Sequence, residues 1–281
     1  MRRWIFTYII YFSVLPIAIQ TLRAQQIPDT SYRPRIEHPA FTFDKGPVVL
    51  IDEAHENFHT ATGRYLPFAE LLRRDGYAVE SSASSLSLEN LKKAKILVIA
   101  NARKYLTAKE TKSVVEWITG GGSLLLIADH PPNVSAAADL GKKLGIKFLE
   151  GTAKEPNGDG RIVFKKSEGL LKEHKITHDI YQVATFTGTS FQLERAGHPL
   201  LVFGSNIYSY KENNDSTSVQ GHLQGAVIEF GKGKIAVFGE AAMFSAQLKG
   251  PEKNPMGMNA PIAKQNWQFL LNIIHWLTLK N

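Results

Sequence analysis

Short apolar runs that alternate with helical patterns constrain the fold of this chain more than any other feature. The runs have the length and the aliphatic composition of buried strands, and they cover residues 48–52, 95–101, 123–129 and, more weakly, 78–82. Helical patterns lie between them at residues 65–72, after the capping box Thr107–Glu110, and at residues 135–144. Strands that alternate with helices are typical of a parallel sheet covered on both faces.

The second half of the chain has a different character. Residues 151–224 are rich in Gly, Thr, Ser and Asn and show little helical patterning, which predicts inserted strands and loops. Residues 225–230 and 234–238 flank a Gly-Lys-Gly turn and predict a β-hairpin, and a final amphipathic helix is predicted at residues 262–279. We therefore predict one α/β domain over residues 47–281, with a doubly wound, mostly parallel, flavodoxin-like sheet and an inserted β/loop region.

The N-terminus has the pattern of a secretory signal. Two arginines precede the apolar run 4–19, and Ala24 ends the segment with a small residue. The run is short for a membrane span and contains Pro16, so a cleaved signal peptide over residues 1–24 is favoured over an uncleaved anchor. The pattern predicts a periplasmic or secreted protein with no stable membrane span after cleavage. Residues 25–46, which contain three prolines, predict an extended lead-in.

Composition narrows the possible functions. The chain has no cysteine, which excludes disulfides, a lipid-modified cysteine at the cleavage site and a catalytic thiol. Its 33 basic and 26 acidic residues form no block of like charge and no basic stripe interleaved with aromatic residues. Nucleic-acid binding is therefore not expected.

The segment 52–59 concentrates three acidic residues and two histidines directly behind the first predicted strand. Its first four residues spell the Asp-Glu-Ala-His motif of helicase-type ATPases. That motif needs a phosphate-binding loop with a lysine, and the glycine-rich stretch 120–123 has no lysine and precedes a strand. We therefore expect no nucleotide.

The same segment also contains the His-Glu-x-x-His motif of zinc peptidases, at His55, Glu56 and His59. On a helix, both imidazoles would face one side. The segment follows a strand, however, and Thr62 and Tyr65 occupy the Gly and His positions of the extended motif. A zinc peptidase stays the less favoured alternative.

Position along the sheet gives a stronger argument than either motif. Ligands bind beyond the carboxyl ends of parallel strands, and polar residues follow several of the predicted strands here. The candidate catalytic groups are Glu53, Glu56 and Glu240. The candidate substrate-binding residues are Asp52, Asn101, Arg103, Thr187 and Ser190. The candidate ligands of a divalent metal such as zinc are His55, His59, Asp129 and His130.

Two stretches of sequence carry a family resemblance. Residues 120–130, followed by 139–146, and residues 231–240 resemble the class I glutamine-amidotransferase-like superfamily, especially its exported and trehalose-utilisation-like members. The resemblance spans roughly residues 47–149 and 225–279 and implies the fold and the position of the pocket. Asp129 and His130 occupy the turn where amidotransferases present a cysteine, and Phe238 stands where a histidine precedes the glutamate. Glutamine hydrolysis is therefore excluded.

Two functions remain open. The first is an exported, metal-assisted hydrolase of a small polar substrate such as a carbohydrate, acting through the strand-end Asp, Glu and His residues. The second is a non-catalytic accessory domain that binds a ligand or a partner.

Overall fold

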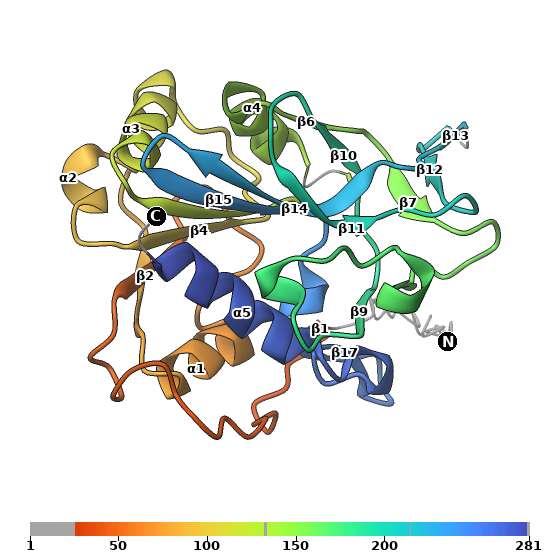
Figure 1. Ribbon diagram of the computed structural model, residues 1–281, viewed down its shortest axis with the longest axis horizontal. Helices are drawn as coiled ribbons and strands as arrows, with labels where there is room; N and C mark the ends of the chain where they lie inside the picture. Colours follow the sequence, from red (N-terminus) through yellow and green to blue (C-terminus); the bar gives the residue numbers. More distant parts are fainter. Residues whose placement is uncertain (1–25, 132–133, 214, 280–281) are drawn as a thin grey trace, which may run out of the picture.

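The computed structural model describes residues 26–131, 134–213 and 215–279 (Figure 1). The predicted signal peptide, residues 1–24, lies outside these ranges. The largest element is a sheet of nine strands.

One half of this sheet is parallel. Its strands lie in the order β3-β2-β4-β5-β15, and each pair of neighbours is parallel. Their bounds are β2 (Val48–Asp52), β3 (Ala78–Ser82), β4 (Ile96–Ala100), β5 (Ser123–Ile127) and β15 (Gly233–Phe238). All four strands predicted in the first half of the chain are therefore present.

The other half of the sheet is antiparallel. The predicted hairpin is confirmed, because β14 runs back along β15 and pairs Gly225 with Phe238. Beyond it lie β10, β6 and β11. The bounds are β14 (Leu223–Phe230), β11 (His198–Val202), β10 (Phe191–Leu193) and β6 (Ile146–Phe148).

Three small antiparallel sheets complete the β structure of the described residues. The first contains β1 (Gln26–Pro28), β16 (Ala246–Lys249) and β17 (Asn254–Gly257). The second contains β7 (Thr152–Lys154), β12 (Tyr208–Tyr210) and β13 (Ser216–Ser218). The third pairs β8 (Ile162–Lys165) with β9 (Gln182–Thr185).

The predicted fold class is wrong. The structure is mostly β, with a mixed central sheet and three antiparallel sheets, rather than a doubly wound, mostly parallel, flavodoxin-like sheet. The alternation of strands and helices stops after residue 144, and the later strands pair antiparallel with partners that lie far away in the sequence. β1 and β16, for example, join Gln26 to Lys249.

The sheet has two apolar faces, and each is covered by helices (Figure 1). Within β2, Val49 and Ile51 belong to one hydrophobic cluster and Leu50 to the other, because successive side chains of a strand point to opposite faces. The helices α1 (Leu66–Arg74) and α5 (Asn266–Thr278) cover the first face. The second face is covered by α2 (Leu88–Leu91), α3 (Ala108–Thr119) and α4 (Ser135–Leu144).

One local prediction for the helices is confirmed. The capping box is formed, with the Thr107 side chain accepting from the Glu110 backbone and the Glu110 side chain accepting from the Thr107 backbone. Four single 3-10 turns also occur: η1 (Lys166–Glu168), η2 (Lys175–Thr177), η3 (Ala242–Phe244) and η4 (Pro261–Ala263).

The topology brings distant residues to one edge of the sheet. The carboxyl ends of β2, β4, β5 and β15 lie together because these strands are parallel. Since β14 is antiparallel to β15, its first residues lie at this same edge, and Gly239 donates its backbone N–H to the carbonyl of Gln224. We call this the carboxyl edge.

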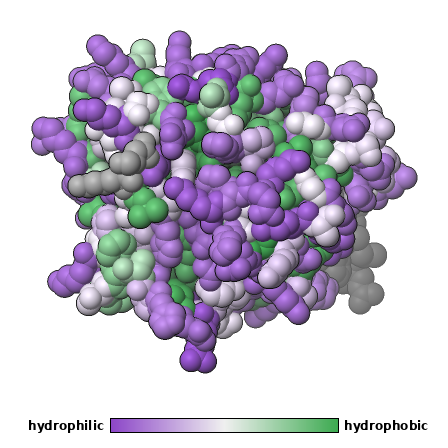
Figure 2. All heavy atoms as spheres, in the orientation of Figure 1, coloured by the Kyte–Doolittle hydropathy of each residue, from purple (hydrophilic) through white to green (hydrophobic). Residues whose placement is uncertain are grey.

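No helix among the described residues is long and apolar enough to cross a membrane. The face seen in Figure 2 carries mainly hydrophilic residues, with hydrophobic ones scattered among them.

Candidate functional site

The loop after β2 is held by a buried ion pair. Asp52 accepts from Nδ1 of His55 at 2.9 Å, and Nε2 of the same imidazole lies 3.4 Å from Glu110 of α3. Burial lowers the pKa of His55, but the two carboxylates outweigh it and the net shift is upward. Asn57 donates to Asp52 at 3.1 Å. With both nitrogens engaged, His55 ties the loop to α3.

This loop is not a helix, so the zinc-peptidase motif lacks its geometry. Glu56 is exposed and has a φ of 51°, in the left-handed region. His55 faces Asp52 and Glu110, whereas His59 contacts Asn101. The two imidazoles therefore do not share one helical face.

A second buried group of polar residues lies further along the carboxyl edge. Asn101, the first residue after β4, donates its Nδ2 to His59 Nδ1 at 3.3 Å and to Asp129 Oδ2 at 3.2 Å. All three side chains are buried. Asn101 has a φ of 48°, a left-handed conformation that asparagine tolerates better than most residues. This backbone conformation directs the Asn101 side-chain amide toward His59 in the loop after β2 and toward Asp129 after β5.

Asp129 and His130 form a dyad at the surface side of this group. The Asp129 carboxylate accepts from His130 Nδ1 at 2.6 Å, and the His130 side chain is 38% exposed. This hydrogen bond raises the pKa of His130 above its usual value. Burial raises the pKa of Asp129, but the hydrogen bond and the charge of His130 outweigh it and hold that pKa below the usual range.

Glu240, the second residue after β15, lies fully buried at the same edge. Its carboxyl oxygens accept from the backbone N–H of Ala242 at 2.8 Å and of Met243 at 2.7 Å. Burial and the nearby Asp129 raise the pKa of Glu240 well above its usual value, whereas the pKa of Asp129 lies below its usual range. The buried Tyr65, whose hydroxyl donates to the Ala241 carbonyl at 3.0 Å, packs its ring against His59.

Several buried polar atoms of this region have no hydrogen-bond partner in the described part of the chain. They are His59 Nε2, Asn101 Oδ1, Ser190 Oγ and both amide atoms of Gln224. Burial lowers the pKa of His59 to about 4, so the imidazole is neutral. Its Nδ1 accepts from Asn101, because the same Nδ2 group also faces the acceptor Asp129. The proton of His59 is therefore on Nε2, which is a free donor, whereas Asn101 Oδ1 is a free acceptor.

Gln224 belongs to the same edge. A Cβ added to Gly188 would lie 2.8 Å from both Gln224 Nε2 and the Cβ of Glu240. The line of buried polar groups therefore continues from His59 and Asn101 through Asp129 and Glu240 to Gln224.

The four predicted metal ligands do not form one set. Across residues 26–131, 134–213 and 215–279, no three His, Cys, Asp or Glu side chains are placed to hold a metal ion. The reason is geometric, since His55 is engaged by Asp52 and Glu110 while His59, Asp129 and His130 belong to the second group.

The remaining predicted residues have other surroundings. Glu53 accepts from the backbone of Ala61 at 2.8 Å and so stabilises the loop. Arg103 is exposed, and Thr187 is half-buried with its methyl group near Gly160. Of the residues predicted to meet at the strand ends, Asn101, Asp129 and Glu240 lie at this edge, together with His59 and His130.

Sequence reasoning missed Arg64, Tyr65 and Gln224. Arg64 and Tyr65 lie just after the His-Glu-x-x-His motif, where a search confined to the motif stops. Gln224 carries no local signal, because only its pairing in β14 brings it beside Glu240.

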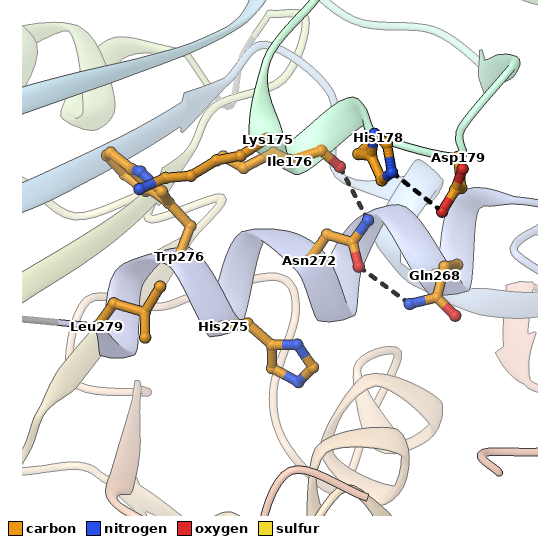
Figure 3. A pocket seen from close by; sticks show the side chains of 9 residues that line it. All are labelled: Lys175, Ile176, His178, Asp179, Gln268, Asn272, His275, Trp276 and Leu279. Atoms are coloured by element: carbon orange, nitrogen blue, oxygen red, sulfur yellow. Dashed lines mark hydrogen bonds and ion pairs between the residues drawn. The ribbon is translucent and has the colours of Figure 1, made fainter. Parts of the chain in front are cut away.

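A pocket elsewhere in the protein offers a contrast. A pocket of about 560 Å³ lies between α5 and the 175–179 turn, and no predicted site residue lines it (Figure 3). Several of its polar side chains are paired: Asn272 donates to the Ile176 carbonyl and accepts from Gln268, and His178 contacts Asp179 (Figure 3). The carboxyl edge, by contrast, keeps several buried groups free.

This fold and edge define a mixed β-rich domain with a buried polar centre. The chain belongs to the domain of unknown function family DUF4350, whose model matches residues 65–248. The predicted membership of the class I glutamine-amidotransferase-like superfamily is wrong, because the family match is to DUF4350. A search of curated proteins gives no match.

Solved structures share the fold at low sequence identity. The mmIFT52 N-terminal domain superposes with a TM-score of 0.64 at 15% identity, covering 83% of this chain and 98% of that one. A cytoplasmic protein from Salmonella typhimurium LT2 superposes with a TM-score of 0.54 at 13% identity, covering 83% of this chain and 99% of that one. A putative ThuA-like protein from Bacteroides uniformis superposes with a TM-score of 0.50 at 11% identity, covering 87% of this chain and 94% of that one. At these identities the likeness concerns the fold alone.

Proposed function

We propose that this protein binds a small polar molecule at the carboxyl edge. The observation that carries the proposal is the set of buried polar atoms that have no partner within the described chain, above all His59 Nε2, Asn101 Oδ1 and the Gln224 amide. Leaving a buried donor or acceptor unpaired costs about 1–3 kcal/mol each. A ligand that pairs with these atoms would recover that cost on binding.

Gln224→Leu tests the proposal. Leucine has a similar size and removes two unpaired buried atoms, so we expect the variant to be more stable by about 1–3 kcal/mol. We also expect it to lose the thermal stabilisation that the wild type gains from its ligand. The probes are sugars, polyols, amides, amino acids and hydroxy acids, each tested by thermal shift.

The exposed Gln220 provides the matched control, Gln220→Leu. Ligand binding that survives Gln224→Leu would place the site elsewhere. The absence of any thermal shift across the whole panel would overturn the proposal.

Hydrolysis of the bound molecule is a second candidate, supported by the Asp129–His130 dyad. A half-exposed imidazole that is oriented by a carboxylate has the arrangement of a general base. We expect His130→Gln to lower kcat on chromogenic esters or glycosides by about 10²–10⁴-fold while ligand binding persists. If the wild type binds a ligand and turns over none of these substrates, the binding role alone stands.

A further inference from the structure

A small pocket lies beside the start of α3, where the loops after β2, β3 and β4 meet the first two turns of that helix. Its volume is about 350 Å³, at the lower end of the range for small-molecule sites. The polar residues that line it include His55, Ser85, Lys104, Lys109, Glu110 and Ser113. His59, Asn101 and Gln224 do not line it. We call it the α3 pocket.

Two unpaired lysines line the α3 pocket. Lys104 and Lys109 are exposed, and neither side chain makes an ion pair or a hydrogen bond with any residue that the structure describes. Glu110 is acidic and also lines the pocket, but both of its carboxyl oxygens are occupied. Oε1 accepts from the backbone of Leu86, and Oε2 accepts from the backbone and the hydroxyl of Thr107. The charges of the two lysines are therefore not balanced within the pocket.

His55 is a buried part of the wall and adds to the positive charge. Its Nδ1 lies 2.9 Å from Asp52, and its Nε2 lies 3.4 Å from Glu110. A neutral imidazole has a proton on only one nitrogen, so a carboxylate at each nitrogen favours the charged, doubly protonated form. This charge offsets the two carboxylates. An anion that enters the pocket therefore meets no unpaired negative group.

Unpaired donors also line the α3 pocket. Ser113 is only 8% exposed, and its hydroxyl has no hydrogen-bond partner in the described ranges; the Ser85 hydroxyl is likewise unpaired. The first turn of a helix has backbone N–H groups without intrahelical acceptors. The Thr107 side chain takes the N–H of Glu110 and leaves that of Lys109. Free N–H groups and the helix dipole together favour an anion at this end of α3.

We propose that the α3 pocket binds a tetrahedral oxyanion, a phosphate or sulfate group, through Lys104, Lys109 and the Ser113 hydroxyl. Lysine binds phosphate as a point charge, whereas planar carboxylates suit the fork of an arginine. Donors from a loop and from a helix suit an ion whose oxygens point in several directions. This site is separate from the proposed polar-ligand site around His59 and Gln224. The oxyanion is either free or part of a small phosphorylated molecule.

Calorimetric titration of the full mature chain tests the inference. The probes are inorganic phosphate, sulfate, glucose 6-phosphate and glucose, all at one ionic strength. We expect one site for an oxyanion, and the affinity should fall as sodium chloride is added, because both lysines are exposed. Tighter binding of phosphate or sulfate would identify a free ion, and tighter binding of glucose 6-phosphate would identify a phosphorylated molecule. Glucose should bind at least about tenfold more weakly than its phosphate, because it lacks the charged contacts.

Variants locate the oxyanion. Lys104→Gln/Lys109→Gln should weaken its binding at least about tenfold, because two charge-assisted contacts are lost. The matched control is Lys172→Gln/Lys264→Gln, which removes the same net charge at two exposed lysines outside the pocket and should leave the affinity unchanged. Ser113→Ala leaves the charge of the pocket intact and should weaken binding about tenfold, because one donor to a charged group is lost.

The outcomes separate this site from the proposed function. The inference is overturned if none of the three oxyanion probes binds, if glucose binds as tightly as its phosphate, or if Ser113→Ala keeps the full affinity. Equal losses in the two double-lysine variants would also overturn it, because they would show attraction to net charge alone. Gln224→Leu should leave oxyanion binding unchanged, and a loss there would place the ion in the other site. None of these results decides the proposed function, which has its own panel of ligands.

Discussion

His59 is the residue whose chemistry the fold changes most clearly. It lies fully buried between the Tyr65 and Phe58 rings, and burial lowers its pKa from 6.5 to about 4. The folded protein therefore takes up this proton less readily than the unfolded chain does. A histidine with a depressed pKa contributes stability above about pH 6.5 that is lost as the pH falls toward 4.

We predict that this loss amounts to about 3 kcal/mol in the wild type and is absent in His59→Gln. Glu240 acts in the opposite direction, because its raised pKa favours folding at low pH. The measurement is therefore the difference between wild type and variant, obtained from urea unfolding at several pH values between 7 and 4. His178→Gln, at a histidine whose side chain is 82% exposed, is the control. Parallel stability curves for the wild type and His59→Gln would contradict the prediction.

The two histidines of the motif show what residue spacing alone can predict. The sequence brought His55 and His59 together as possible partners, because they are four residues apart. The structure separates them, since Asp52 and Glu110 hold His55 on one side of the loop while Asn101 and Tyr65 hold His59 on the other. Spacing alone could not reveal this, because the segment does not form the helix that the motif requires.

At the scale of elements, the first turn of α3 connects a local signal with a distant contact. Thr107 and Glu110 form the capping box, and the same Glu110 carboxylate also accepts from the backbone of Leu86 and faces His55. Although burial raises the pKa of Glu110, these hydrogen bonds lower it to about 2. The helix start therefore anchors both the α2 region and the β2 loop.

Removing the cap should weaken this anchor by a modest amount. We predict that Thr107→Ala lowers the free energy of unfolding by about 1 kcal/mol, because the Glu110 backbone N–H loses its acceptor. Denaturant unfolding of the variant measures the loss, with Thr42→Ala at an exposed position as the control. An unchanged midpoint for Thr107→Ala would show that water replaces the cap without cost.

Local elements were predictable where the signal was local. Strand runs, the capping box and the β14–β15 hairpin each depend on neighbouring residues, and the structure contains all of them. Short strands such as β10 and β6 carry little signal of their own. They exist because Phe191 pairs with Phe148 and Leu223 across the chain, and periodicity in a short window cannot report such pairs.

On the scale of the whole molecule, the lead-in before β2 packs against the body of the protein. Phe41 donates its backbone N–H to Asp75 at 3.1 Å, and Gly46 donates to Gly76 at 2.8 Å. Gly76 has a φ of 95°, and a Cβ added there would collide with the Phe41 carbonyl. This glycine permits the close contact between the two segments.

We predict that Gly76→Ala destabilises the protein by about 3 kcal/mol and exposes residues 38–46 to proteolysis, since both backbone strain and a steric clash oppose the native contact. Gly169→Ala is the matched control. Gly169 also has a positive φ, 68°, but no atom lies within 4 Å of the added Cβ, so this variant measures the backbone strain alone. Equal losses in the two variants would show that the contact with Phe41 contributes nothing.

The sequence by itself determined the four strand runs of its first half, the β14–β15 hairpin, the longer helices, the α3 capping box and the concentration of polar groups at strand ends, because each depends on residues close together in the chain. Only the tertiary structure decided the mixed, mostly β architecture, the separation of His55 from His59 and the arrival of Gln224 beside Glu240. These features arise from antiparallel pairing and burial between distant segments. A linear pattern identifies which groups can do chemistry, whereas packing decides which of them meet and which are left without a partner.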